Sequence, residues 1–282
     1  MLGPGILARF LEVAAPPDRY GHAWQYNSQS DRHSKVGCWA VALDLLVECP
    51  LLRQHASEGK VILGVNHPML DFVNNREKAL DLVIAKPSGP VGPSADTFKG
   101  LVHRFGIILN EGVSAALDSV PDIAIAGVGA PLIALEAKAT MTAHSAAKPR
   151  LYDELSSSHQ AVHGASASAI AIGYVQINAA EKFASSVSNR YSWDLMPPTI
   201  NQHKQPKAVL DVLQKIEQLP RRSGAGGIGF DGIGVTVLDL ENMGGPVTVV
   251  KGPPAPQPGN AFHYETMIVR MATEYSSRFA NI

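Results

Sequence analysis

The stretch at residues 120–139, VPDIAIAGVGAPLIALEAKA, constrains the fold most strongly, because it is apolar on both sides of a pair of glycines. Residues 122–126 and 131–138 are short and rich in strand-forming side chains. Gly127 and Gly129 between them supply turn chemistry. The pattern therefore predicts a β-hairpin with two buried arms.

Three charged side chains stand in this apolar stretch, namely Asp122, Glu136 and Lys138. Side chains alternate faces along a strand, so Glu136 and Lys138 are expected to project from the same side. Charges at the end of a buried hairpin are costly unless they are paired or bind a metal. Carboxylate oxygens are ligands that Mg²⁺ prefers. The pattern predicts a Mg²⁺ site held by Asp122 and Glu136, with Lys138 orienting or deprotonating an attacking water.

A Pro-Asp pair ending at Asp122, followed by Glu136-Ala137-Lys138, resembles the active-site motif of the PD-(D/E)XK nuclease superfamily, which includes most type II restriction endonucleases. The resemblance extends loosely over residues 98–178, where helix, strand, strand, helix and strand are expected in that order. It implies a restriction-endonuclease-like core in which Asp122 and Glu136 bind Mg²⁺ and the carbonyl of Ala137 is a further ligand. It also implies double-stranded DNA as substrate and a homodimer, because a twofold protein cuts two antiparallel strands symmetrically.

Two acidic residues upstream compete for a place in this site. Asp81 lies in a second expected strand, residues 79–85, and Glu77 lies just before it. Asp122 is preferred as the metal ligand because its strand is expected to turn directly into the strand of Glu136. Glu77 and Asp81 remain candidates for an additional acidic ligand, and a solvated strand end is the alternative for each.

Composition sets the frame for this site. A chain of 282 residues with 45% hydrophobic and 17% charged residues can bury the core of one large domain. We expect a single α/β nuclease domain over residues 1–282, with a central mixed β-sheet flanked by helices and a catalytic core at about residues 97–178. Residues 1–96 and 184–282 would then supply recognition or dimerisation elements.

The remaining expected elements follow from periodicity and turn signals. Helices are expected at residues 35–48, 149–163, 207–218 and 261–279, and strands at 60–65, 168–178, 232–239 and 246–250. The cysteines, Cys38 and Cys49, are expected to be reduced core residues. Without a leader or a membrane-length apolar run, the chain is expected to be cytoplasmic and to have no membrane partner.

A net charge of −1 gives no global signal for nucleic-acid binding, so substrate contacts would need local clusters of polar and basic side chains. Such clusters occur in the irregular segments 18–34 and 184–207, in the glycine-rich segment 221–229 and on the expected helix 149–163. A zinc site is the alternative for the two histidines of that helix. The candidates for substrate binding are Lys148, Arg150, His159, Gln160, His163, Arg190, His203, Lys204, Arg221 and Arg222.

The sequence favours a Mg²⁺-dependent DNA endonuclease, with a type II restriction enzyme as the leading form. One alternative is a nuclease effector of another defence or repair system, gated by a partner or ligand. A second is a non-catalytic binding or assembly protein, in which Glu136 and Lys138 are a solvated pair on an edge hairpin.

Overall fold

The computed structural model describes residues 1–72, 75–92, 95–224 and 226–282, and it shows an α/β fold built on a mixed six-stranded sheet. The strand order is β1-β2-β3-β4-β7-β8. The pairs β3–β4 and β4–β7 are parallel, whereas β1–β2, β2–β3 and β7–β8 are antiparallel. The strands are β1 (Ile62–Asp71), β2 (Arg76–Pro87), β3 (Val128–Thr140), β4 (Ile170–Asn178), β7 (Gly232–Asp239) and β8 (Thr248–Val249). A separate antiparallel pair joins β5 (Lys182–Ala184) to β6 (Ile200–Gln202).

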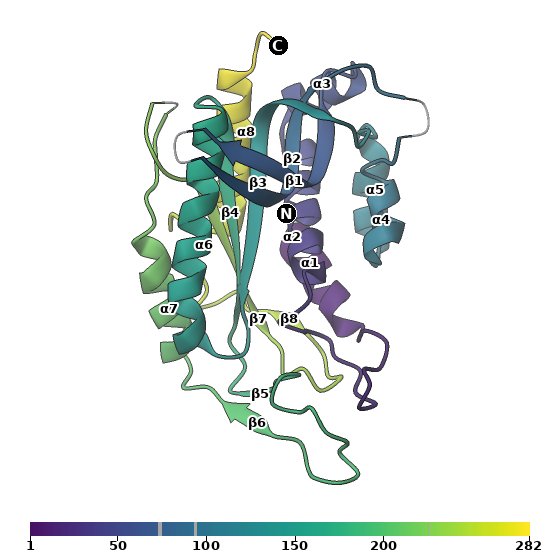
Figure 1. The fold of residues 1–282 in the computed structure, drawn as a ribbon, viewed down its shortest axis with the longest axis vertical. Coiled ribbons are helices and arrows are strands. Elements are labelled where there is room, and N and C mark those ends of the chain that lie inside the picture. The colour runs from purple at the N-terminus through teal and green to yellow at the C-terminus, as the bar shows by residue number, and fades with distance from the viewer. Residues whose placement is uncertain (73–74, 93–94, 225) are drawn as a thin grey trace.

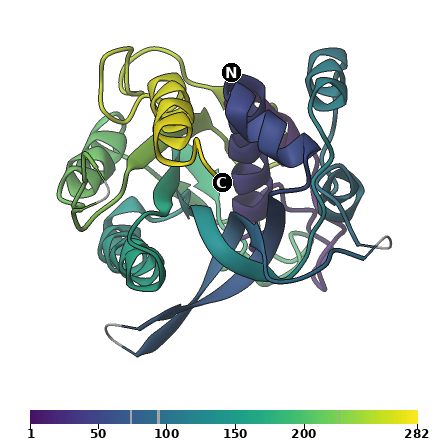
Figure 2. The ribbon, with the colours of Figure 1, turned by 90° about the horizontal axis from the view of Figure 1, so that it is seen from above.

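Helices cover both faces of the sheet (Figures 1 and 2). They are α1 (Gly3–Glu12), α2 (Arg32–Glu48), α3 (Pro50–Ser57), α4 (Gly100–Phe105), α5 (Glu111–Ser119), α6 (His144–Ala165), α7 (Lys207–Glu217) and α8 (Tyr264–Arg278). One hydrophobic core lies between the sheet and α1, α2, α3 and α8, and a second lies between the sheet and α6 and α7. No helix within the described ranges has the length and apolar character needed to cross a membrane.

Helix α2 is buried on nearly all sides and lies directly against the sheet. Gly37 permits this close approach, since a Cβ there would stand only 2.8 Å from the Tyr174 ring of β4. Strand β4 is buried along its whole length, because it has a parallel neighbour on each edge and a helical layer on each face. Cys38 of α2 and Cys49 at its end are buried free thiols.

The predicted mixed sheet flanked by helices is confirmed. Helices at 35–48, 207–218 and 261–279 and strands at 60–65, 79–85, 168–178 and 232–239 appear with shifted ends as α2, α7, α8, β1, β2, β4 and β7. The strand expected at 246–250 appears in part as β8, which pairs antiparallel with β7.

The predicted hairpin at residues 122–138 is wrong. Its second arm is part of β3, but β3 pairs with β2 and β4, and its first arm makes only isolated bridges. Ala124 pairs with Thr97, and Ile125 pairs with Leu63 on the outer edge of β1. The chain then passes Gly127, whose carbonyl accepts a hydrogen bond from the Ser88 backbone, before entering β3. The apolar first arm therefore covers a sheet edge rather than forming one side of a hairpin.

Two further expectations change. Helix α6 begins at His144 and continues through Pro149, so Lys148 and Arg150 lie within the helix and not beside its free amino-terminal N–H groups. The sheet takes strands from residues 62 to 249, so a core limited to residues 97–178 would omit β1, β2 and β7.

Candidate active site

The candidate site lies where β2 and β3 separate. The two strands pair from Pro87 with Val128 as far as Leu82 with Leu135. Beyond that point β2 continues with β1 as a two-stranded ribbon that reaches α6, while β3 continues beside β4 (Figure 1). In the resulting gap the backbone N–H and C=O groups of β2 and β3 no longer pair with each other, so polar side chains can bond to them.

Asp81 is the first residue of β2 beyond the paired region, and its side chain enters this gap. Its Oδ2 accepts a hydrogen bond of 2.9 Å from the backbone N–H of Ala137, and the Cys38 thiol lies 3.8 Å from the same oxygen. The N–H and C=O of one strand residue point to the same side, so the Ala137 carbonyl also faces the gap. That carbonyl accepts a hydrogen bond of 3.3 Å from Ser34 Oγ.

Glu136 and Lys138 project together from β3, as their spacing predicts. Lys138 Nζ lies 2.8 Å from Glu136 Oε1 and 3.0 Å from Glu154 Oε2 of α6. The Glu136 side chain is only 4% exposed. Among the described residues its Oε2 has no hydrogen-bond partner. A buried carboxylate oxygen without a donor is costly, so this atom marks a place for a cation or another ligand.

Lys78, which sequence reasoning missed, is a second cation at Glu136. It projects from the β1–β2 ribbon, and its Nζ lies 3.5 Å from Glu136 Oε1. The same ammonium donates a 3.3 Å hydrogen bond to the backbone carbonyl of Glu154. Arg150 pairs with the Glu154 carboxylate along α6. Nothing in the local sequence around Lys78 connects it to Glu136. Its position could be predicted only by knowing that β2 lies beside β3.

Burial and neighbouring charges shift the pKa values of Asp81 and Lys138. Burial, followed by repulsion from Glu136, raises the pKa of Asp81 to about 6. Burial lowers the pKa of Lys138, but the Glu136 and Glu154 carboxylates outweigh it and hold the pKa above its ordinary value. This arrangement holds Lys138 in its protonated form, which favours the orienting role over deprotonation of water.

The donor set suits a hard divalent cation. Asp81 and Glu136 supply two carboxylates, and Mg²⁺ typically uses one or two and completes its shell with water and phosphate oxygens. No group of three or more His, Cys, Asp or Glu side chains within the described ranges is arranged to hold a metal by itself. The unpartnered Oε2 of Glu136 and the raised pKa of Asp81 are what a cation would relieve.

The structure does not bring Asp122 into this site. Asp122 is exposed, and its Oδ1 accepts a hydrogen bond of 2.9 Å from the backbone N–H of Lys99 beside α4. The segment that follows it runs along the outer edge of β1, on the side away from β2. Asp81 lies where Asp122 was expected, beside Ala137 and Glu136. Glu77 is exposed on the β1–β2 ribbon.

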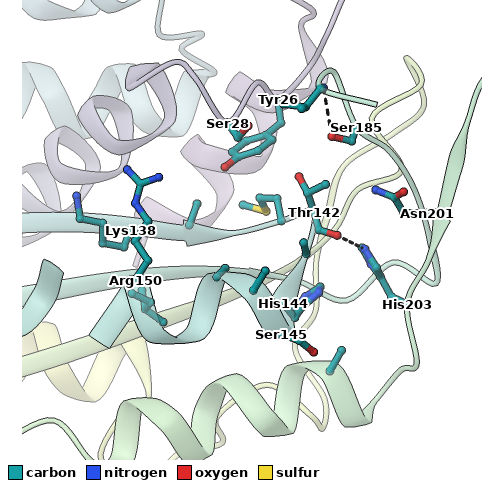
Figure 3. A pocket seen from close by; sticks show the side chains of 18 of the residues that line it. Tyr26, Ser28, Lys138, Thr142, His144, Ser145, Arg150, Ser185, Asn201 and His203 are labelled. Carbon is teal, nitrogen blue, oxygen red and sulfur yellow. Dashed lines mark hydrogen bonds between the residues drawn. The ribbon is translucent and has the colours of Figure 1, made fainter. Parts of the chain in front are cut away.

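A cleft of about 1310 Å³ opens beside Lys138 (Figure 3). Its wall combines the end of β3 and the first half of α6 with parts of the irregular segments 18–34 and 184–207. Tyr26 projects into it opposite Arg150, and His203 closes the other end with ring nitrogens 2.7 Å from the Thr142 carbonyl and 2.9 Å from the Ala180 carbonyl. The basic side chains of the lining are Lys138, Arg150, Lys204 and Lys207, and the acidic ones are Asp31, Glu154 and Asp211.

Of the predicted substrate contacts, Arg150, His203 and Lys204 line this cleft. Lys148 lies near its edge, with Nζ 3.6 Å from Asp211. Three others are exposed elsewhere: Gln160 on α6, Arg190 in the loop between β5 and β6, and Arg221, whose guanidinium lies over the Phe262 ring.

The structure places the remaining three side chains within the fold and away from this cleft. Arg222 is buried and its Nε pairs with Asp231 at 2.9 Å. A ring nitrogen of His163 lies 2.8 Å from the Gly229 carbonyl. His159 is fully buried with its ring edge-on to Phe230, so neither histidine is free to meet DNA.

Substituting His159 with Phe is expected to flatten the pH dependence of stability. Burial, then His163 and Arg222, lowers the pKa of His159 to about 4. Since the folded pKa lies below the unfolded value of about 6.5, the unfolded chain binds the extra proton, and stability is lost as pH falls from about 6.5 towards 4. At pH 5 the substitution should recover about 1 to 2 kcal/mol of unfolding free energy.

Urea denaturation at pH 7.5 and pH 5 measures this change. His33, whose pKa burial also lowers to about 4, should keep part of the pH dependence in both proteins. An identical loss of stability on acidification with and without His159 would contradict the assignment.

Comparison of the chain with models of known families, with curated proteins and with solved structures gives no match.

Proposed function

We propose that this chain is a Mg²⁺-dependent nuclease that hydrolyses DNA phosphodiester bonds. Its catalytic residues would be Asp81, Glu136 and Lys138. One observation carries the proposal. The Asp81 and Glu136 carboxylates repel each other where β2 and β3 separate, Glu136 has a buried oxygen without a partner in the described structure, and the Lys138 ammonium lies 2.8 Å from Glu136.

The order of elements around this site supports the proposal. Helices α2 and α3 are followed by β1 and β2, then by α4 and α5, and then by β3, α6 and the parallel strand β4. The helix, paired strands, helix and strand expected from the PD-(D/E)XK resemblance are thus available, although they start earlier in the chain than residue 98. Leu80 rather than proline precedes Asp81, so the resemblance depends on two carboxylates and a lysine and not on the literal Pro-Asp.

In this proposal Asp81 and Glu136 hold Mg²⁺, and the Ala137 carbonyl faces the same gap. A bound ion of this kind polarises a phosphoryl oxygen and makes a water more acidic. Lys138 remains protonated, so it orients the attacking water and offsets the charge that builds on the phosphate. The cleft beside Lys138 receives the nucleic acid, with Arg150 and Lys204 near its backbone.

Incubation of the purified protein with plasmid and linear DNA tests this function. Cleavage is expected with Mg²⁺ and not with EDTA, and Lys138→Met should slow it by at least about 100-fold, as expected for removal of a group that stabilises the transition state. Lys251→Met, which removes an exposed lysine elsewhere, is the matched control.

The pattern of products then distinguishes the forms of this function. Discrete fragments would support a sequence-specific restriction enzyme, and a metal-dependent smear would support a less specific effector. DNA that stays intact with Mg²⁺ and with Mn²⁺ would overturn the proposal for the protein acting alone.

A further inference from the structure

The side chains around Glu136 form a cluster of three carboxylates and three cations. The carboxylates are Asp81, Glu136 and Glu154, and the cations are Lys78, Lys138 and Arg150. With all six ionised their charges cancel, so the cluster is balanced without metal and without substrate.

Lys78 and Lys138 share one oxygen of this cluster. Both ammonium groups lie within 3.5 Å of Glu136 Oε1, at 3.5 Å and 2.8 Å. Their side chains keep 21% and 25% of their surface exposed, whereas that of Glu136 keeps 4%. The carboxylate is therefore enclosed, and the two cations form the boundary between it and solvent.

A divalent cation on Asp81 and Glu136 changes this balance. It would add two positive charges and satisfy the carboxylate that now attracts both lysines. The cluster would then carry an excess of positive charge at its exposed side, where Lys78 and Lys138 lie. A phosphate is the anion that restores neutrality there, and a compact ammonium group binds phosphate as a point charge.

We propose that Lys78 is a second phosphate-binding lysine of this site, held by Glu136 in the absence of metal and released to the substrate phosphate when metal binds. This inference rests on the proposed function and extends it to a residue outside the motif. The hydrogen bond from Lys78 to the Glu154 carbonyl holds the ammonium against α6, beside a residue that lines the cleft. Metal and nucleic acid therefore favour each other's binding.

Lys78→Met tests the proposal through two affinities, of which only the affinity for DNA should fall. Removal of a cation that competes for Glu136 should leave Mg²⁺ affinity of the free protein unchanged or stronger, as measured by calorimetry. Removal of a phosphate contact should weaken binding of a fluorescent DNA oligonucleotide by about 10-fold in Ca²⁺, which replaces Mg²⁺ to prevent cleavage. Lys78→Arg should restore much of the DNA affinity.

Lys86→Met is the matched control, because Lys86 lies on the same strand about 26 Å further along. It should alter neither affinity. Weakening of both metal and DNA binding in Lys78→Met would show a structural role and overturn the proposal. A change in metal affinity alone, or no change in either, would overturn it equally.

The role of Lys78 and the proposed function can be distinguished by these measurements. If the unsubstituted protein binds Mg²⁺ and cleaves DNA while Lys78→Met binds DNA normally, only the role of Lys78 falls. If the unsubstituted protein binds no Mg²⁺, the proposed function falls and the role of Lys78 falls with it.

Discussion

Asp81→Asn is expected to reduce Mg²⁺-dependent DNA cleavage by at least about 100-fold, because even partners that only support a metal ligand are worth about 10- to 100-fold in activity. Asp122→Asn should stay within about 3-fold of the unsubstituted protein, since Asp122 is exposed and bonds only to a backbone N–H near α4 in the described structure. Single-turnover cleavage of a labelled duplex measures both rates.

Unfolding measurements separate this effect from loss of fold. Burial and Glu136 raise the pKa of Asp81, so its ionised form is strained in the folded protein, and Asn at this position should not lower thermal stability in the absence of metal. Loss of cleavage in Asp122→Asn with normal rates in Asp81→Asn would reverse the assignment of the two residues.

Asp231→Ala is expected to cost about 3 to 5 kcal/mol of unfolding free energy, which is typical when one partner of a buried ion pair is removed. Asp231 is fully enclosed, and its Oδ1 lies 2.9 Å from Arg222 Nε and 2.6 Å from Arg278. Its Oδ2 accepts a 2.8 Å hydrogen bond from the Ala171 backbone. The substitution would leave the Arg222 guanidinium buried without its counter-charge.

Chemical denaturation measures this loss, with Asp239→Ala as control at the exposed end of the same strand, β7. The control should change stability by less than about 0.5 kcal/mol. An Asp231→Ala protein as stable as the unsubstituted protein would contradict the structural role of this ion pair.

The sequence predicted Glu136 and Lys138 correctly as neighbours on one face, because that prediction needs only the two-residue period of a strand. It could not place Asp81. The carboxylate reaches Ala137 across 56 positions of chain, through pairing of β2 with β3. The intervening segment at residues 122–126 is as apolar as a strand. Hydrophobic periodicity alone does not distinguish a strand of the sheet from an extended segment that covers the edge of the sheet.

For the candidate substrate contacts, too, local sequence patterns were informative where a position depends on the local chain and uninformative where it depends on long-range packing. The irregular segments containing Tyr26 and His203 were candidates for substrate recognition, and residues of both line the cleft. The glycines around Arg222 favoured an exposed loop, but the buried position of Arg222 depends on Asp231 at the start of β7. Likewise, the spacing of His159 and His163 gave a shared helix face without showing that this face packs against Phe230.

The most direct test of a metal site at Asp81 and Glu136 is titration with Mn²⁺, which takes the same oxygen ligands as Mg²⁺ and is detected by electron paramagnetic resonance. The unsubstituted protein and Asp122→Asn should bind one ion with equal affinity. Asp81→Asn and Glu136→Gln should each bind it at least about 10-fold more weakly. Equal binding by all four proteins, or loss of binding only in Asp122→Asn, would contradict a catalytic metal centre between β2 and β3.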